Sequence, residues 1–223
     1  LVIIPKKAAT HIQKTAPGPP AQIANATPMM LPVPTREAVE TINLVNISFS
    51  EALPLSPLHW IISDKQESIV AEPMGEGLCL YENPLGILTN SPPFPYHLQH
   101  MADFSALRPD EPDNRFLEDG ILQYSNGMGA IGLPGDFSSA SRFIRAAFVR
   151  KNSVSEGSEI SQFFHLLASV SMPAGSVQIG RKNEITRYSS CCDTENGLFY
   201  YTTYENSRIT GIDMHKCHLS GCN

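Results

Sequence analysis

The sequence has no apolar stretch that approaches the roughly 18 residues needed to cross a bilayer. It also lacks an excess of basic charge, because 16 Lys and Arg stand against 22 Asp and Glu, which gives a formal net charge of −6. Proteins that bind nucleic acid or anionic lipid surfaces usually carry a clustered positive charge, and this chain has none. These absences predict no nucleic-acid partner and no membrane partner.

Cysteine is scarce and its spacing fits neither a zinc site nor a secreted disulfide framework. The five cysteines are Cys79, Cys191, Cys192, Cys217 and Cys222. The opening residues, LVIIPKKAAT, place their apolar run before the lysines, which is the reverse of the order in a signal peptide. Together these features predict a cytoplasmic protein whose cysteines stay reduced.

The chain is long enough for one sizeable core, since it has 223 residues of which 42% are hydrophobic. Residues 1–34 differ from the rest because they are rich in proline, contain no acidic residue and follow no sustained period. We therefore expect an irregular segment over residues 1–34 and a single domain after it.

Strands and helices are predicted in separate blocks along the rest of the chain. Strands are expected at 58–64, 68–74, 78–82, 86–90, 184–192, 198–204 and 208–214, and helices at 35–42, 96–107, 138–151 and 159–172. Such segregation, with short turns between neighbouring strands, favours an α+β fold of antiparallel sheets with helices packed on them.

Two polar positions in apolar or glycine-rich surroundings are candidates for chemistry. Asn90, in LTNSP, lies at the end of a predicted strand, where its side-chain N–H can face an oxyanion. Arg142, in SSASRF, lies in the first turn of a predicted helix, where it can direct a fixed positive charge at a site. Each residue also has a simpler interpretation, because an asparagine before Ser-Pro often forms a turn and such an arginine often lies on the surface.

Other side chains that could react have simpler interpretations. Cys79 lies in an apolar strand without a nearby base, so a buried inert thiol is favoured over a nucleophile. His165 accompanies the apolar stripe of a predicted helix and is interpreted as a packed or surface histidine. No phosphate-binding glycine loop, H-E-x-x-H or G-x-S-x-G motif is present.

Several long segments, in a consistent order over about residues 36–214, resemble the choloylglycine hydrolase family, which includes bile salt hydrolases and penicillin V acylases. The segments are PLHWIISDKQESIVAE, YENPLGILTNSPPFPYHL, GMGAIGLPGDFSSASRFIRAAFVRKNSV, SQFFHLLASV and YSSCCDTENGLFYYTTYENSRITGIDM. The resemblance implies an N-terminal nucleophile hydrolase fold, which is a four-layer αββα sandwich, and a homotetramer. It also implies hydrolysis of conjugated bile salts, or of penicillin V, without a metal or organic cofactor.

The resemblance assigns roles to two residues of this sequence. Asn90 falls on the family's oxyanion asparagine, and Arg142 falls on its active-site arginine, which keeps the surroundings of the nucleophile polar and oriented. The family's nucleophile is a cysteine exposed as the first residue, with its own α-amino group as the base, and no residue of this chain matches it.

Both ends of the sequence leave the family pattern. Residues 1–34 and 215–223 do not resemble it, so residues 35–214 are interpreted as a partial family domain, the carboxyl-terminal portion of an incomplete sandwich. We therefore expect little or no amidase activity from this chain alone. The competing hypothesis is a non-catalytic remnant or bile-acid-binding fragment.

Overall fold

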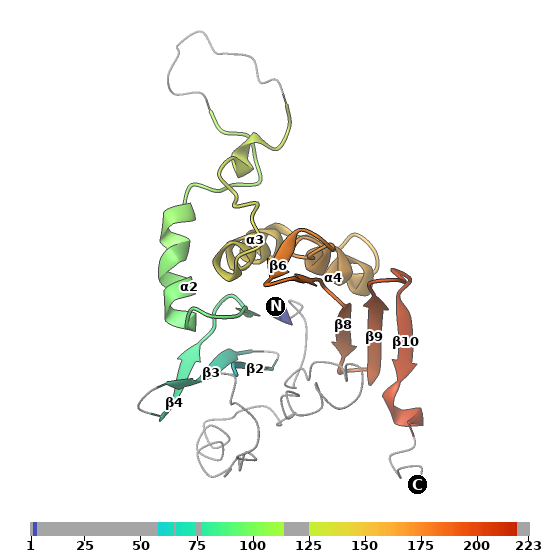
Figure 1. Ribbon diagram of the computed structural model, residues 1–223. Coiled ribbons are helices and arrows are strands. Elements are labelled where there is room, and N and C mark those ends of the chain that lie inside the picture. The colour runs from blue at the N-terminus through green and yellow to red at the C-terminus, as the bar shows by residue number, and fades with distance from the viewer. Residues whose placement is uncertain (1, 4–57, 65, 75–76, 114–124, 218–223) are drawn as a thin grey trace.

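A computed structural model of the chain describes residues 2–3, 58–64, 66–74, 77–113 and 125–217 (Figure 1). The helix predicted at 35–42 and nearly all of the irregular segment predicted at 1–34 lie outside these residues.

The first sheet is an antiparallel meander of β2 (Trp60–Ser63), β3 (Ser68–Met74) and β4 (Gly77–Glu82). Its register pairs Ile61 with Val70, and Val70 with Tyr81. Consecutive residues of β2 and β3 are buried, so both faces of these strands are covered. The meander confirms the three strands predicted at 58–64, 68–74 and 78–82.

The next strand, β5 (Ile87–Leu88), is shorter than the predicted 86–90 and pairs with β1 (Val2–Ile3) in an antiparallel two-stranded sheet. A turn precedes it, in which the amide of Asn83 donates to the carbonyl of Ile87 at 3.1 Å and accepts from the Ile87 N–H at 3.4 Å. Gly86 completes this turn with a φ of +58°, a conformation that favours glycine. The chain then leaves the strand at Thr89 and Asn90.

The helix predicted at 96–107 has different ends in the structure. α2 spans Phe94–His100 and continues as a short 3₁₀ helix, η2, over Met101–Phe104. Pro95 suits the first turn, where no intrahelical N–H bond is lost. The Phe94 N–H is bonded to a side chain of β3, so the helix begins two residues earlier than its own sequence pattern indicates.

The two longer helices follow a short 3₁₀ helix, η3 (Met128–Ala130). α3 spans Ser139–Asn152 and is capped by Ser138, whose hydroxyl accepts from the Ser141 N–H at 3.2 Å. α4 spans Glu159–Ala168 and therefore ends four residues before the predicted end at 172. Buried Val170 of its apolar stripe lies in the turn that follows the helix.

The last part of the described chain holds two hairpin-based sheets. β6 (Val177–Ile179) and β7 (Lys182–Glu184) form a mostly exposed hairpin that the sequence pattern did not predict. β8 (Tyr188–Asp193), β9 (Leu198–Thr203) and β10 (Thr210–Asp213) form an antiparallel sheet, after which η4 spans Met214–Lys216. The strand predicted at 184–192 is thus wrong at its start, because residue 184 ends one hairpin and β8 begins at 188.

The helices connect the sheets. α3 and α4 lie side by side above the strands in Figure 1, with α2 packed on α3, α3 on β5 and α4 on β8. One core runs through all of these elements; its buried members are Ile61, Val70, Ile87, Leu88, Phe94, Phe143, Ile144, Ala146, Ala147, Phe163, Leu166, Val170 and Cys191. The structure confirms an α+β fold of antiparallel sheets covered by helices.

Among the helices that the structure describes, none combines the length and the apolarity needed to span a membrane.

Candidate active site

The predicted residue Asn90 lies at the end of β5, where the chain turns toward α2. Thr89 before it is buried, whereas Asn90 is exposed. The Asn90 carbonyl accepts from the Ser139 hydroxyl at 2.6 Å and lies 3.0 Å from Nε2 of His97. The backbone of Asn90 is therefore fixed, while its side chain can reach solvent.

The predicted residue Arg142, the fourth residue of α3, points at Asn90. Its Nη2 donates to Oδ1 of Asn90 at 2.9 Å, and its Nε donates to the Phe137 carbonyl at 3.1 Å. A guanidinium has donors only, so it selects the oxygen of the Asn90 amide. Nδ2 of Asn90, with its two N–H donors, is then turned away from Arg142 and left for another acceptor.

Arg142 is held in a nearly solvent-free position, with 8% of the residue exposed. Burial lowers the pKa of its guanidinium, which nearby Arg145 also lowers and Glu184 opposes. An arginine stays charged under these conditions. The site therefore contains a permanent positive charge beside a neutral amide donor.

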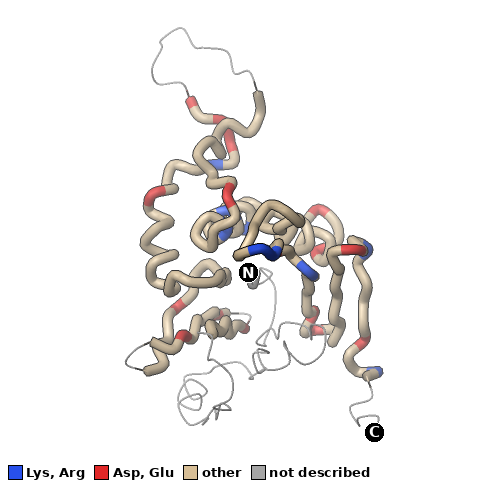
Figure 2. The backbone as a smooth tube through the Cα atoms, viewed as in Figure 1, with Lys and Arg blue, Asp and Glu red and all other residues tan. Residues whose placement is uncertain are grey.

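Basic residues gather on α3 (Figure 2): Arg142 is buried, Arg145 and Arg150 are half-buried, and Lys151 is exposed. Arg145 donates to the carbonyls of Pro134 and Asp136, both at 2.7 Å, and to that of Ser169 at 2.9 Å. Arg145 thus fastens the segment before α3 to the end of α4. This positioning role was not predicted from the sequence.

A carboxylate organises the start of α3 next to the site. Asp136 accepts from the Ser138 N–H at 2.9 Å and from the Ser141 hydroxyl at 2.5 Å. Hydrogen bonds from Ser138 and Ser141 lower the pKa of Asp136 to about 2. Because Ser138 caps α3, this network sets the direction from which Arg142 reaches Asn90.

Two further side chains near the site were missed by the sequence predictions. Glu72 in β3 is 2% exposed and accepts the Phe94 N–H through both carboxylate oxygens, at 3.1 and 3.0 Å; it also pairs with Nδ1 of His59. His97 in α2 is fully buried and its Nε2 faces Asn90. A carboxylate inside the apolar run SIVAEPM was the signal that could have revealed Glu72.

The adjacent cysteines of β8, Cys191 and Cys192, do not supply an activated nucleophile to this site. Cys191 is buried and Cys192 half-buried, because neighbours in a strand point to opposite faces of the sheet. Burial raises the pKa of the Cys191 thiol to about 12 and also raises that of Cys192, so neither is a thiolate at neutral pH. Cys79 in β4 was predicted to be buried, but in the structure it is only half-buried.

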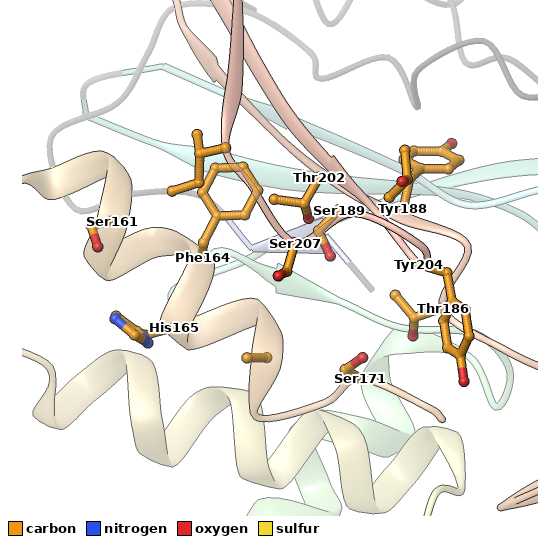
Figure 3. A pocket seen from close by; sticks show the side chains of 13 residues that line it. Ser161, Phe164, His165, Ser171, Thr186, Tyr188, Ser189, Thr202, Tyr204 and Ser207 are labelled. Atoms are coloured by element: carbon orange, nitrogen blue, oxygen red, sulfur yellow. The ribbon is translucent and has the colours of Figure 1, made fainter. Parts of the chain in front are cut away.

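A separate cavity of about 440 Å³ lies between α4 and the strands β8 and β9 (Figure 3). Hydroxyl groups line much of it, including those of the cross-strand pair Ser189 and Thr202, and exposed His165 stands at its wall. Neither Asn90 nor Arg142 lines it, and the described residues of its lining include no carboxylate and no cysteine. The cavity is therefore distinct from the Asn90 site.

Metal ligation has no candidate in the described part of the chain, because no group of three or more His, Cys, Asp or Glu side chains is placed to hold an ion.

Comparisons with known proteins agree on one family. A family model described as linear amide C–N hydrolases, choloylglycine hydrolase family, matches residues 33–223. A bile salt hydrolase/transferase of Lactiplantibacillus plantarum is 51% identical over 189 residues, which are 82% of this chain and 58% of the relative. A bile salt hydrolase/transferase of Clostridium perfringens is 40% identical over 192 residues, or 83% of this chain and 58% of the relative.

Solved structures give the same result for the fold. A mutant conjugated bile acid hydrolase from Clostridium perfringens superimposes with a TM-score of 0.73 at 39% identity, over 84% of this chain and 60% of that one. A penicillin V acylase from Agrobacterium tumefaciens gives a TM-score of 0.60 at 22% identity, over 81% of this chain and 51% of that one, and shows the fold alone. This chain thus spans about three fifths of the length of the bile salt hydrolases.

The fold is that of the N-terminal nucleophile hydrolases to which these structures belong, as the resemblance implied. The chain belongs to the choloylglycine hydrolase family of linear amide C–N hydrolases.

Proposed function

We propose that this chain is part of an enzyme that hydrolyses the amide bond of glycine- or taurine-conjugated bile salts. The relatives of highest identity named above are bile salt hydrolases, whereas the penicillin V acylase is only a distant neighbour in fold. Bile salts are therefore preferred over penicillin V as substrate. We further propose that the enzyme is cytoplasmic, assembles as a homotetramer, and uses no metal or organic cofactor.

The observation that carries the proposal is the hydrogen bond from Arg142 to Oδ1 of Asn90. It leaves the exposed N–H donors of Asn90 in a fixed direction before substrate arrives. Hydrolysis of an amide passes through a tetrahedral intermediate with a negative oxygen, and a preorganised donor stabilises that charge without reorganising during the reaction. Asn90 is assigned the role of oxyanion donor, and Arg142 orients it.

The nucleophile in this proposal is a cysteine supplied by an amino-terminal segment outside this sequence. The raised pKa of the Cys191 and Cys192 thiols argues against either as a substitute. We accordingly expect the chain alone to give little or no turnover, because covalent catalysis needs the nucleophile itself.

Two proteins test the proposal: the 223-residue chain alone, and a chimera in which the amino-terminal segment of the Lactiplantibacillus plantarum relative precedes residues 33–223. Release of glycine or taurine from conjugated cholate is measured for both, with penicillin V as the alternative substrate. We expect product from the chimera on bile salts and none from the chain alone. A folded chimera that releases neither amino acid would refute the function, and preference for penicillin V would refute the substrate.

Asn90→Ala tests the role assigned to the amide. This substitution in the chimera should lower kcat by about 10²–10³-fold, the usual loss for one oxyanion donor. A chimera whose kcat is unchanged by Asn90→Ala would place the oxyanion elsewhere.

A further inference from the structure

We propose that His97 and Ser139 are positioning residues that together hold the backbone carbonyl of Asn90 and thereby aim its side chain. The proposal rests on the function proposed above, because it treats Asn90 as the oxyanion donor. The two residues come from different helices: His97 from α2 and Ser139 from α3.

The carbonyl of Asn90 has two hydrogen-bonding neighbours. The Ser139 hydroxyl donates to it at 2.6 Å, and Nε2 of His97 lies 3.0 Å from it. A carbonyl oxygen has two lone pairs, so both of its acceptor positions are used. Two bonds from two helices restrain the peptide more tightly than one, because they fix its rotation as well as its position.

The contacts of His97 determine which ring nitrogen carries the proton. The carbonyl of Asn90 only accepts, so Nε2 must hold the hydrogen to bond it. Nδ1 is buried and no described residue forms a hydrogen bond with it, which suits a bare nitrogen better than a buried N–H. The geometry thus selects a neutral ring with its hydrogen on Nε2, which also faces the Thr89 hydroxyl at 3.3 Å.

Packing fixes the ring in place. His97 stacks on Phe143 of α3, with ring centroids 4.8 Å apart and an angle of 15° between the planes. The first residue of α2 is bonded in turn to the buried carboxylate of Glu72 in β3. His97 therefore links the peptide of Asn90 to the first sheet and to α3.

Fixing the backbone matters for catalysis because, among the described residues, only Arg142 forms a hydrogen bond with the side chain of Asn90. If the peptide rotates, Nδ2 moves relative to the scissile carbonyl even when the bond to Arg142 persists. Misplacement by about 1 Å can cost on the order of 10²-fold in rate. His97 and Ser139 act through Asn90 in this account and do not touch the substrate.

The first test uses the whole 223-residue chain and needs no activity. Long-range ¹H–¹⁵N spectra of labelled histidine report the tautomer of each ring. We expect His97 to be neutral with its hydrogen on Nε2 at neutral pH, and to become protonated only at a lower pH than an ordinary histidine, since burial lowers its pKa. The charged groups that face it are Glu72, which opposes this shift, His59, which adds to it, and Arg142 beyond Asn90. A hydrogen on Nδ1 alone, or a charged ring at neutral pH, would contradict the proposal.

The second test uses the chimera and compares isosteric variants. His97→Phe keeps the stacked ring but removes the donor, and should lower kcat by about tenfold with KM little changed. His97→Gln, which restores an N–H donor, should recover part of that loss. His100→Phe on the same helix is the control, because His100 contacts Asp103 and not Asn90.

Ser139→Ala keeps the proposal testable if His97→Phe does not fold, because Ser139 lies outside the core. It should lower kcat by several-fold, and Ser139→Thr should restore it. In an Asn90→Ala background neither His97→Phe nor Ser139→Ala should lower kcat further, whereas a merely structural effect would add. An active chimera indifferent to both substitutions would overturn this inference alone. A folded chimera without activity would overturn the proposed function and the inference with it.

Discussion

The guanidinium of Arg142 donates to the side-chain oxygen of Asn90 across 52 positions of sequence. The bond joins the end of a two-residue strand to the first turn of α3, so the amide can be correctly oriented only when both elements are in place. Residues that act as one unit in catalysis give strongly non-additive effects when they are removed one by one.

Arg142→Lys in the chimera is the first test of this unit. Lysine keeps a positive charge but loses the planar fork that reaches Asn90 and Phe137 together, so we expect kcat to fall by about tenfold or more. The double variant Asn90→Ala with Arg142→Lys should be no slower than Asn90→Ala alone. Exposed Arg187, replaced by alanine, serves as the control. Additive losses in the double variant would mean that Arg142 contributes independently of Asn90.

Glu72→Gln should destabilise the fold although it changes one atom. The substitution removes the charge that accepts the Phe94 N–H and pairs with His59, and bonds to charged groups contribute about 1.5–3 kcal/mol. We expect the free energy of unfolding in urea to fall by roughly this amount. Glu82→Gln, on the exposed end of β4, should change it by less than about 0.5 kcal/mol. If Glu72→Gln and Glu82→Gln changed the free energy of unfolding equally, the buried charge of Glu72 would not be what stabilises the fold.

The start of α3 should be sensitive to acid because of Asp136. The pKa of Asp136 is lowered from 3.8 to about 2 in the folded chain by bonds from Ser138 and Ser141. A lowered folded pKa means that the ionised form stabilises the fold above about pH 4 and that this contribution is lost as the pH falls toward 2. The exposure of Asp136 and solvent screening keep the contribution small.

Asp136→Asn tests this linkage by thermal unfolding of the chimera from pH 7 to pH 2. The difference in Tm from the unsubstituted protein should be constant above about pH 5 and should shrink between about pH 4 and pH 2. Asp113→Asn, in an exposed position, is the matched control. A difference that stays constant down to pH 2 would show that the Asp136 carboxylate is not stabilised in the folded state.

Local signals explain what the sequence alone predicted correctly. α3 was predicted to within one residue because its cap at Ser138 and its basic end at Lys151 lie inside the segment. The meander β2–β3–β4 was predicted because neighbouring strands pair through short turns. The start of α2 was missed because its first N–H bonds to Glu72, which is 22 positions away.

The residues of the candidate site likewise fall into those that the sequence predicted and those that it did not. Asn90 and Arg142 were found because the motifs around them resemble a family, and the structure brings the two residues together. His97 was not found, because it contacts a backbone carbonyl, a threonine hydroxyl and a phenyl ring, and no sequence pattern marks such a set of partners. The β6–β7 hairpin was missed because each of its strands has only three residues, too few to establish a period, and β7 is entirely polar and exposed.

Two glycines of the segment before α3 should respond differently to alanine. A Cβ on buried Gly129 would lie 2.7 Å from the Arg108 carbonyl oxygen and against that of Asp110, and the Arg108 N–H bonds the Gly129 carbonyl at 3.0 Å. Backbone atoms cannot move aside as a flexible side chain can, so Gly129→Ala should lower the free energy of unfolding by about 1–3 kcal/mol. A Cβ on Gly135 meets nothing within 4 Å, and Gly135→Ala should be neutral to within about 0.5 kcal/mol. Urea unfolding of the two variants decides the matter, and a stable Gly129→Ala protein would show that the loop at 108–110 does not pack on this glycine.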